Sequence, residues 1–215
     1  MYDYTEDQDA LILRRIRTRN TGNIFLVCRV CPSRGRFRAK GESVSVTDKT
    51  TNLFLRISEH RVVDNYLPKI RRCLDSLNTQ QLWEHETHEA NSVGGILLHI
   101  CEQFDRHTAR YNQVGTVTAA GIEDYFPDMG LSPEELVAKI EETFTAWQRA
   151  IHELLSDESR VVDLFSIYHL IEHTSYHLGQ IVDRLQRKTG ESFQFVQKGL
   201  NERSLRAIVE DETVG

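Results

Sequence analysis

The chain has 215 residues and a net charge of −6, with 40% hydrophobic and 27% charged residues. This length accommodates one domain with a sizeable core, and the composition is typical of a soluble globular protein. No apolar run approaches the ~20 residues that cross a bilayer, so we expect no membrane partner. The acidic N-terminal residues differ from a secretory signal, which predicts a cytoplasmic protein.

Charge divides the chain into two parts. Residues 1–56 contain 11 Lys/Arg against 6 Asp/Glu, whereas residues 57–215 contain 15 against 26. An acidic body argues against nucleic acid as its partner. We define residues 1–51 as a basic N-terminal extension and assign it no fold. It is interpreted as a disordered, solvated tail or as a segment that the cellular protein lacks, and an interaction module acting through it is the third alternative.

The four cysteines fit reduced and mostly buried thiols better than a disulfide framework. They are Cys28, Cys31, Cys73 and Cys101. Cys28 and Cys31 form a CxxC, but no second CxxC or nearby histidine completes a zinc knuckle. We therefore interpret this CxxC as part of a solvated loop.

The first predicted helix starts near Asn52 and carries an apolar stripe at three- and four-residue steps. The members of this stripe are Val63, Tyr66, Ile70, Cys73, Leu74 and Leu77. Pro68 lies inside the stripe, where its missing N–H is expected to bend the helix or to mark its true start. The polar segment 82–90 is predicted to be a connection to the next helix.

Capping residues predict where the next two helices begin. Asn91 or Ser92 can cap a second helix whose buried face runs from Val93 to Phe104. The third helix opens at the sequence SPEE, beginning at Ser132. Serine at the N-cap, proline at the first helical position and glutamate at the third form a capping box.

The C-terminal third of the chain predicts one long and one short helix. The fourth long helix follows residues 157–160 and ends at Gly190, behind two basic residues. Residues 191–212 are predicted to form a connection and a last helix. Because the sequence lacks strand-like alternation, we predict an all-α protein, with a four-helix bundle at residues 52–212.

The segment 167–181, IYHLIEHTSYHLGQI, contains the most informative pattern: His169, His173 and His177 recur every four residues. Residues four apart lie on the same face of an α-helix, about 6 Å apart along its axis. Two imidazoles in this arrangement can hold one metal ion from one side. Histidine is only an average helix former, so helix propensity does not account for the repeat.

A metal site needs at least three protein ligands, and His99 is the candidate for the third. It lies in GGILLHICEQ, among apolar neighbours that face the predicted core. A single histidine on such a face is more often a satisfied core residue, but the pair formed by His173 and His177 shifts the balance towards a ligand. His169 lies one turn too far to bind the ion together with His177, so we expect it to orient a ligand or to contact the substrate.

The remaining histidines show no such pattern. His107 lies two turns beyond His99 and is expected to be exposed. The spacing of HTSYH also differs from the zincin motif, because Thr174 stands where HExxH places its glutamate base. Peptidase activity by that route is therefore not expected.

Two sequence motifs resemble those of the DinB/YfiT-like superfamily of metalloenzymes. NSVGGILLHI at residues 91–100 is similar to the motif on the family's second helix, Asn-Ser-Ile-Gly followed by leucines and a histidine. HTSYHLGQI at residues 173–181 is similar to the motif on the family's fourth helix, HxxxH followed by x-Gly-Gln-Ile. The resemblance covers about residues 54–205, includes the ending FQFVQKGLNE, and departs at Leu178, where the family often has arginine.

The resemblance implies a four-helix bundle in which His99, His173 and His177 bind zinc, nickel or another divalent ion, and the sequence does not choose among these metals. Characterised relatives include thiol S-transferases that use low-molecular-weight thiols, whereas others have a DNA-damage-inducible or unknown role. Three neutral ligands leave the ion its +2 charge, so a bound thiol or water would lose its proton near neutral pH. This physics is compatible with thiol transfer.

The predicted function is that of a metal-dependent transferase that joins a low-molecular-weight thiol to an electrophilic small-molecule substrate. Gln180 lies near the ligand turn and is expected to orient a ligand or the thiol, and Tyr176 and His169 are candidates for lining the cavity. The alternative is a non-catalytic metal-binding or stress-response bundle, which a fourth protein ligand such as His169 would favour. An open coordination position would favour the transferase. A homodimer stays open as a further partner.

Overall fold

Every regular element in the described part of the chain is a helix, which confirms the all-α prediction. The computed structural model describes residues 49–112, 125–157, 159–195 and 199–214. Within these ranges no strand occurs. The predicted extension up to residue 48, with Cys28 and Cys31, lies outside the described residues.

One long helical segment forms the N-terminal part of the described fold. α1 (Lys49–His60) passes into the π-helical stretch η1 (Arg61–Tyr66), and α2 (Leu67–Leu74) continues it with Pro68 in its first turn. Proline has no N–H to donate to the carbonyl four residues back, and the wider π turns before it absorb this loss. Pro68 therefore stands at the start of α2, one of its two expected positions, although helical backbone already precedes it from Lys49 onwards.

A short helix, α3 (Thr79–Trp83), lies where the sequence predicted only a polar connection. Asn78 caps it, because its side-chain oxygen accepts from the backbone N–H of Gln81 at 2.9 Å and Gln81 Oε1 accepts from the backbone N–H of Asn78 at 3.0 Å. Leu82 and Trp83 are buried. Two buried residues give no periodicity to detect, which is why the pattern of apolar residues missed this helix.

The next two long helices begin at the residues that the sequence indicated. Ser92 caps α4 (Val93–Tyr111) by accepting a hydrogen bond from the backbone N–H of Gly95. The Ser132 capping box opens α5 (Pro133–Ser156), with the two reciprocal bonds to Glu135 at 3.2 and 2.8 Å. Both predictions are confirmed.

The C-terminal elements also follow the prediction. α6 (Leu164–Thr189) is capped by Asp163, whose side chain accepts from the backbone N–H of Ser166. It ends at Gly190, which adopts the left-handed conformation at φ 73° that glycine tolerates without strain. A last helix, α8 (Glu202–Val214), follows.

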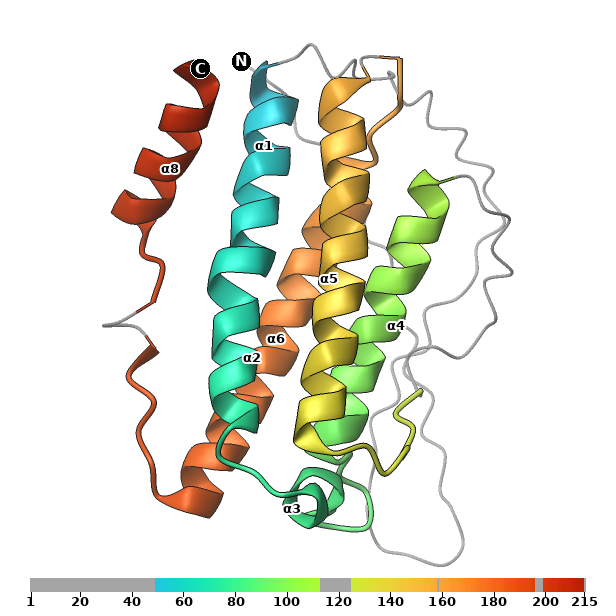
Figure 1. The fold of residues 1–215 in the computed structure, drawn as a ribbon, viewed down its shortest axis with the longest axis vertical. Helices are drawn as coiled ribbons and strands as arrows, with labels where there is room; N and C mark the ends of the chain where they lie inside the picture. The colour runs from blue at the N-terminus through green and yellow to red at the C-terminus, as the bar shows by residue number, and fades with distance from the viewer. Residues whose placement is uncertain (1–48, 113–124, 158, 196–198, 215) are drawn as a thin grey trace, which may run out of the picture. The chain divides into compact units, whose positions relative to one another are not determined.

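Four long helical segments share one core (Figure 1). The segment from α1 to α2 packs against α5 and α6, while α4 packs against α5 and α6. At the centre, the ring of Phe104 lies 4.5 Å from that of Phe144 and 5.4 Å from that of Trp147. α8 contacts α1 at the edge of this arrangement. The four-helix bundle remains our interpretation of these contacts, to which α3 and α8 are additions.

Cys73 and Cys101 are free thiols buried in this core. Burial disfavours the charged thiolate and raises the pKa of each to about 12. These two cysteines therefore match the prediction of buried thiols, and neither is activated for nucleophilic chemistry.

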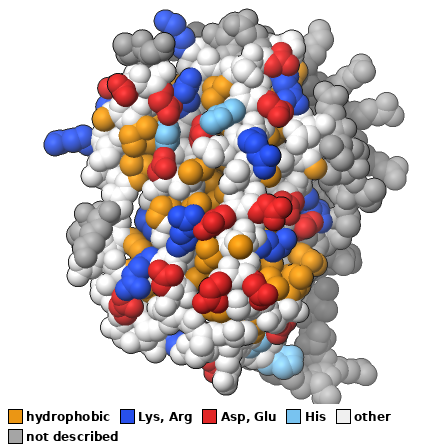
Figure 2. Space-filling model, viewed as in Figure 1, with side chains coloured by type: hydrophobic (Ala, Val, Ile, Leu, Met, Phe, Trp, Pro, Cys, Tyr) orange, Lys and Arg blue, Asp and Glu red, His pale blue; other side chains and the backbone are white. Residues whose placement is uncertain are grey.

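The surface carries charges of both signs. Figure 2 shows Lys and Arg interspersed with Asp and Glu on one face, with hydrophobic side chains between them. Ion pairs join segments that are far apart in sequence, as between Arg71 and Glu141 at 2.6 Å and between Arg56 and Glu212 at 2.8 Å. Among the helices of the described ranges, none has the length and apolar character to span a membrane.

Candidate metal centre

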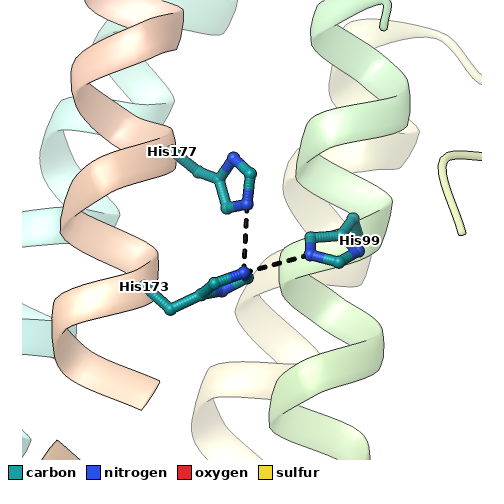
Figure 3. Close-up of side chains that lie close together, drawn as sticks. All are labelled: His99, His173 and His177. Carbon is teal, nitrogen blue, oxygen red and sulfur yellow. Dashed lines mark hydrogen bonds between the residues drawn. The ribbon is translucent and has the colours of Figure 1, made fainter. Parts of the chain in front are cut away.

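Three histidine side chains converge between α4 and α6 (Figure 3). His99 comes from the middle of α4, and His173 and His177 come from successive turns of α6. The Nε2 of His173 lies 3.2 Å from the Nε2 of His99 and 3.2 Å from the Nε2 of His177. The candidate ligand atoms of all three lie within 4.8 Å of one another. The fold thus brings together the three histidines that the sequence selected.

These separations fit a single divalent ion. Imidazole nitrogens bind zinc at about 2.0–2.1 Å, so two such ligands at a tetrahedral angle lie about 3.3 Å apart. The two Nε2 separations of 3.2 Å match this value closely. Imidazole ligands suit zinc and nickel alike, so this set of donors does not distinguish the two metals.

Hydrogen bonds on the far side of two rings direct their lone pairs to the centre. His99 Nδ1 lies 3.2 Å from the backbone carbonyl oxygen of Tyr125, to which it donates. His177 Nδ1 donates to Gln180 Oε1 at 2.9 Å, while the amide Nε2 of Gln180 donates to the Tyr176 hydroxyl at 2.9 Å. Because each ring carries its proton on Nδ1, each Nε2 presents a lone pair to the cluster.

The position of His173 also favours a cation shared by the three rings. Its Nε2 faces the two acceptor nitrogens of His99 and His177, and its Nδ1 is buried and makes no hydrogen bond in the described part of the chain. A single proton on Nε2 can serve only one of the two neighbours at a time. One metal ion would accept all three Nε2 lone pairs at once, with the proton of His173 on Nδ1.

Burial keeps the rings of α6 in the form that a metal requires. The pKa of His173 is lowered to about 4, first by burial and then by the neighbouring His177, His99 and His169 rings. Burial also lowers the pKa of His177, with Arg184 acting in the same direction and the hydrogen bond to Gln180 opposing it. Metal binding needs neutral imidazole. His173 therefore stays neutral well below pH 7, and the lowered pKa of His177 favours its neutral form as well.

An aromatic side chain closes one side of the cluster. Phe126 stacks on His99 with ring centroids 4.4 Å apart and an interplanar angle of 18°, and its ring lies 6.2 Å from that of His177. His99 itself is 1% exposed. This packing fixes the orientation of His99 and excludes water from that side.

The other candidate residues lie at the edge of the cluster. Gln180 binds His177, and Tyr176 is 62% exposed with its ring 5.3 Å from that of His177. The exposed His169 lies outside the group of three, with its ring centroid 5.6 Å from that of His173. The fold therefore places Gln180 as an orienting partner of a ligand and leaves His169 and Tyr176 beside the cluster.

The expectation that His107 is exposed was wrong. Its side chain is 4% exposed, and its Nδ1 accepts a hydrogen bond from Trp147 Nε1 at 3.4 Å. The signal was present in the sequence, because Ile100, Phe104, His107 and Tyr111 follow one another at steps of four, three and four residues on one helical face. The spacing from His99 alone did not indicate that face.

Comparison with known proteins identifies no relative of this chain. No protein-family model matches it, and neither the curated proteins nor the solved structures contain a match. Membership of the DinB/YfiT-like superfamily therefore stays a prediction from the sequence motifs at residues 91–100 and 173–181.

Proposed function

We propose that the protein binds one divalent ion, zinc or nickel, through His99, His173 and His177 and uses it to transfer a low-molecular-weight thiol to an electrophilic small molecule. The observation that carries this proposal is the convergence of three Nε2 atoms, two of them 3.2 Å from the third. The proposal that a thiol is transferred is supported by the resemblance of two sequence motifs to the DinB/YfiT-like superfamily.

The set of ligands favours a reactive ion over a purely structural one. Structural zinc sites use four protein ligands, whereas catalytic sites use three and keep a position for water or substrate. Within the described residues, no fourth histidine, cysteine or carboxylate joins the cluster. Three neutral imidazoles leave the +2 charge on the ion, and this charge lowers the pKa of a bound thiol or water towards neutrality.

A non-catalytic metal-binding protein is the second candidate. Its support is the position of the cluster, which would tie α4 to α6 across 74 residues of sequence. The burial of His99 against Phe126 suits such a clamp. Under this alternative the ion stabilises the fold and reacts with nothing.

Metal analysis tests the site itself. Purified full-length protein is compared with His173→Ala and with His169→Ala, the matched control on the same face of α6. We expect stoichiometric zinc or nickel in the wild type and in His169→Ala, and loss of the metal in His173→Ala. An equal metal content in His173→Ala would show that the site is wrong.

A conjugation assay separates the two candidates. The metal-loaded protein is incubated with a panel of low-molecular-weight thiols and a chromogenic aryl halide, and the rate is compared with that of the uncatalysed reaction. We expect acceleration in the wild type and none in His173→Ala. A protein that binds metal but accelerates no member of the panel would favour the non-catalytic candidate.

A further inference from the structure

A cavity of about 190 Å³ lies beside the histidine cluster. From α4 it is lined by Gln103, Arg106, His107 and Arg110, and from α6 it is lined by His169 and His173, among others. His173 belongs to both the cavity and the cluster. A ligand in this cavity would lie beside His173, one of the three candidate metal ligands, and the volume suits a small ligand or one end of a larger one.

The charged groups in the wall of this cavity are cationic. Arg106 and Arg110 line it, and none of its described lining residues is Asp or Glu. The Nε of Arg106 donates to Glu102 Oε1 at 2.9 Å, and Arg110 donates to Ser166 Oγ at 3.3 Å. These contacts hold both guanidinium groups at the wall. Glu102 offsets part of the charge of Arg106, whereas the described partner of Arg110 is a neutral hydroxyl.

His107 adds a neutral ring to the same wall. Its Nδ1 accepts from Trp147 Nε1, so its proton is on Nε2. This Nε2 is buried, and the backbone carbonyl of Ser166 on α6 interacts with its N–H. Burial, together with Arg110, lowers the pKa of His107 to about 4, so the ring is neutral near pH 7.

We propose that this cavity binds the carboxylate or phosphate group of a ligand whose other end reaches the three histidines. Guanidinium groups bind such oxyanions through paired, charge-assisted hydrogen bonds. Arg106 and Arg110 lie about 10 and 16 Å along α4 from His99, so a chain of several atoms separates the anion from the metal-binding atom. The metal-binding end of this ligand rests on the proposed function, and the substrate class becomes a thiol with a remote acidic group.

A matched pair of thiols tests the proposal: 6-mercaptohexanoate and 6-mercaptohexan-1-ol have the same length and differ in charge. Each is titrated into the full-length protein, with and without zinc, while the side-chain Nε–H signals of Arg106 and Arg110 are followed by NMR. We expect only the carboxylate to shift these signals, and its Kd with zinc to be at least about tenfold lower than that of the alcohol, as for a hydrogen bond to a charged group. Equal affinities of the two thiols would overturn the proposal.

Substitution of one arginine makes the test specific. Arg110→Gln removes the charge at an exposed position, and Arg187→Gln removes one from the far end of α6, where Arg187 pairs with Asp183 at 2.9 Å. We expect Arg110→Gln to lose most of the preference for the carboxylate and Arg187→Gln to keep it. An undiminished preference in Arg110→Gln would contradict the proposed site.

The same titrations distinguish failure of this inference from failure of the proposed function. A protein that binds no metal but still shifts its arginine signals with the carboxylate retains the anion site and loses the metal function. A protein that binds zinc and does not distinguish the two thiols retains the metal site and loses the anion site. Acetate and inorganic phosphate, titrated against the same signals, show which oxyanion the cavity prefers.

Discussion

At the scale of single residues, the histidine cluster depends on partners that do not belong to it. The Tyr125 carbonyl and the Gln180 side chain accept the Nδ1 protons of His99 and His177, and so determine which nitrogen of each ring faces the centre. Such partners orient a ligand and raise its basicity. The amide of Gln180 is in turn oriented by the Tyr176 hydroxyl.

Replacing Gln180 by alanine should weaken metal binding without abolishing it. The change leaves all three ligands in place but frees the His177 ring to rotate and to exchange tautomers. We expect the affinity for zinc, measured by competition with a chromogenic chelator, to fall by about 10- to 100-fold. The matched control is Gln80→Ala at an exposed position of α3. Unchanged affinity in Gln180→Ala would contradict an orienting role.

His107 should make the stability of the metal-free protein depend on pH. Its pKa is about 4 in the folded protein and 6.5 as the reference for the unfolded chain. The unfolded state therefore binds more protons between these values. The contribution of His107 is complete above pH 6.5 and is lost as the pH falls towards 4. It amounts to about 3 kcal/mol.

The variant His107→Gln tests this dependence, because glutamine does not titrate. Urea unfolding of the metal-free proteins between about pH 7 and pH 4.5 should give a shallower loss of stability in the variant than in the wild type. The exposed His88→Gln serves as the control and should follow the wild type. His60, whose hydrogen bonds to Asp64 and Glu212 outweigh burial and raise its pKa, acts with the opposite sign in all three proteins. Identical slopes for wild type and His107→Gln would contradict the prediction.

At the scale of the elements, capping residues determine where the helices begin, and small residues determine how closely they pack. A Cβ atom at Gly94, in the first turn of α4, would lie 2.5 Å from Cζ3 of Trp83. Trp83 cannot easily move away, because its ring is buried and its Nε1 donates to the Leu131 carbonyl at 2.8 Å. This glycine therefore allows α3 to lie against α4.

Two glycine-to-alanine variants should change stability in opposite directions. Gly94→Ala should destabilise the protein by about 1–3 kcal/mol, because its methyl group overpacks against Trp83. Gly179→Ala, inside α6 and with no atom within 4 Å of the added Cβ, should stabilise it by about 0.5–1 kcal/mol. Urea unfolding of both variants gives the two free energies. Changes of the same sign would contradict this account.

At the scale of the whole molecule, the cluster joins two helices that are distant in sequence. His99 and His173 are separated by 74 residues and approach only because α4 and α6 pack against each other. An ion held there would bind the folded state and not the unfolded chain. Metal binding and global stability should therefore be coupled.

Removal of the metal should lower the melting temperature of the wild type. At a free metal concentration about 100 times the Kd, binding contributes about 2.7 kcal/mol, and excess chelator removes this contribution. We expect a fall in Tm by several degrees in the wild type, no further fall in His173→Ala, and recovery when zinc is restored. Differential scanning calorimetry measures all three. A chelator effect of equal size in His173→Ala would place the stabilising ion elsewhere.

The sequence by itself determined the helical class, most helix ends and the three histidines. These features are local: a cap such as Ser132, a terminator such as Gly190 and the four-residue repeat at His173 and His177 act within one or two helical turns. His99 was selected because an apolar helical face predicts that its side chain points into the core. Which side chains contact His99 is decided by the packing of α4 against the other helices.

Only the tertiary structure decided what surrounds those residues. The continuation of the helix through Pro68, the burial of His107 against Trp147 and the cavity containing Arg110 all depend on contacts between segments far apart in the chain. Hydrophobic periodicity predicts which face of a helix is buried, but not which side chain of another helix meets it or at what depth. That pairing is determined by side-chain shape and interhelical packing, which no local pattern encodes.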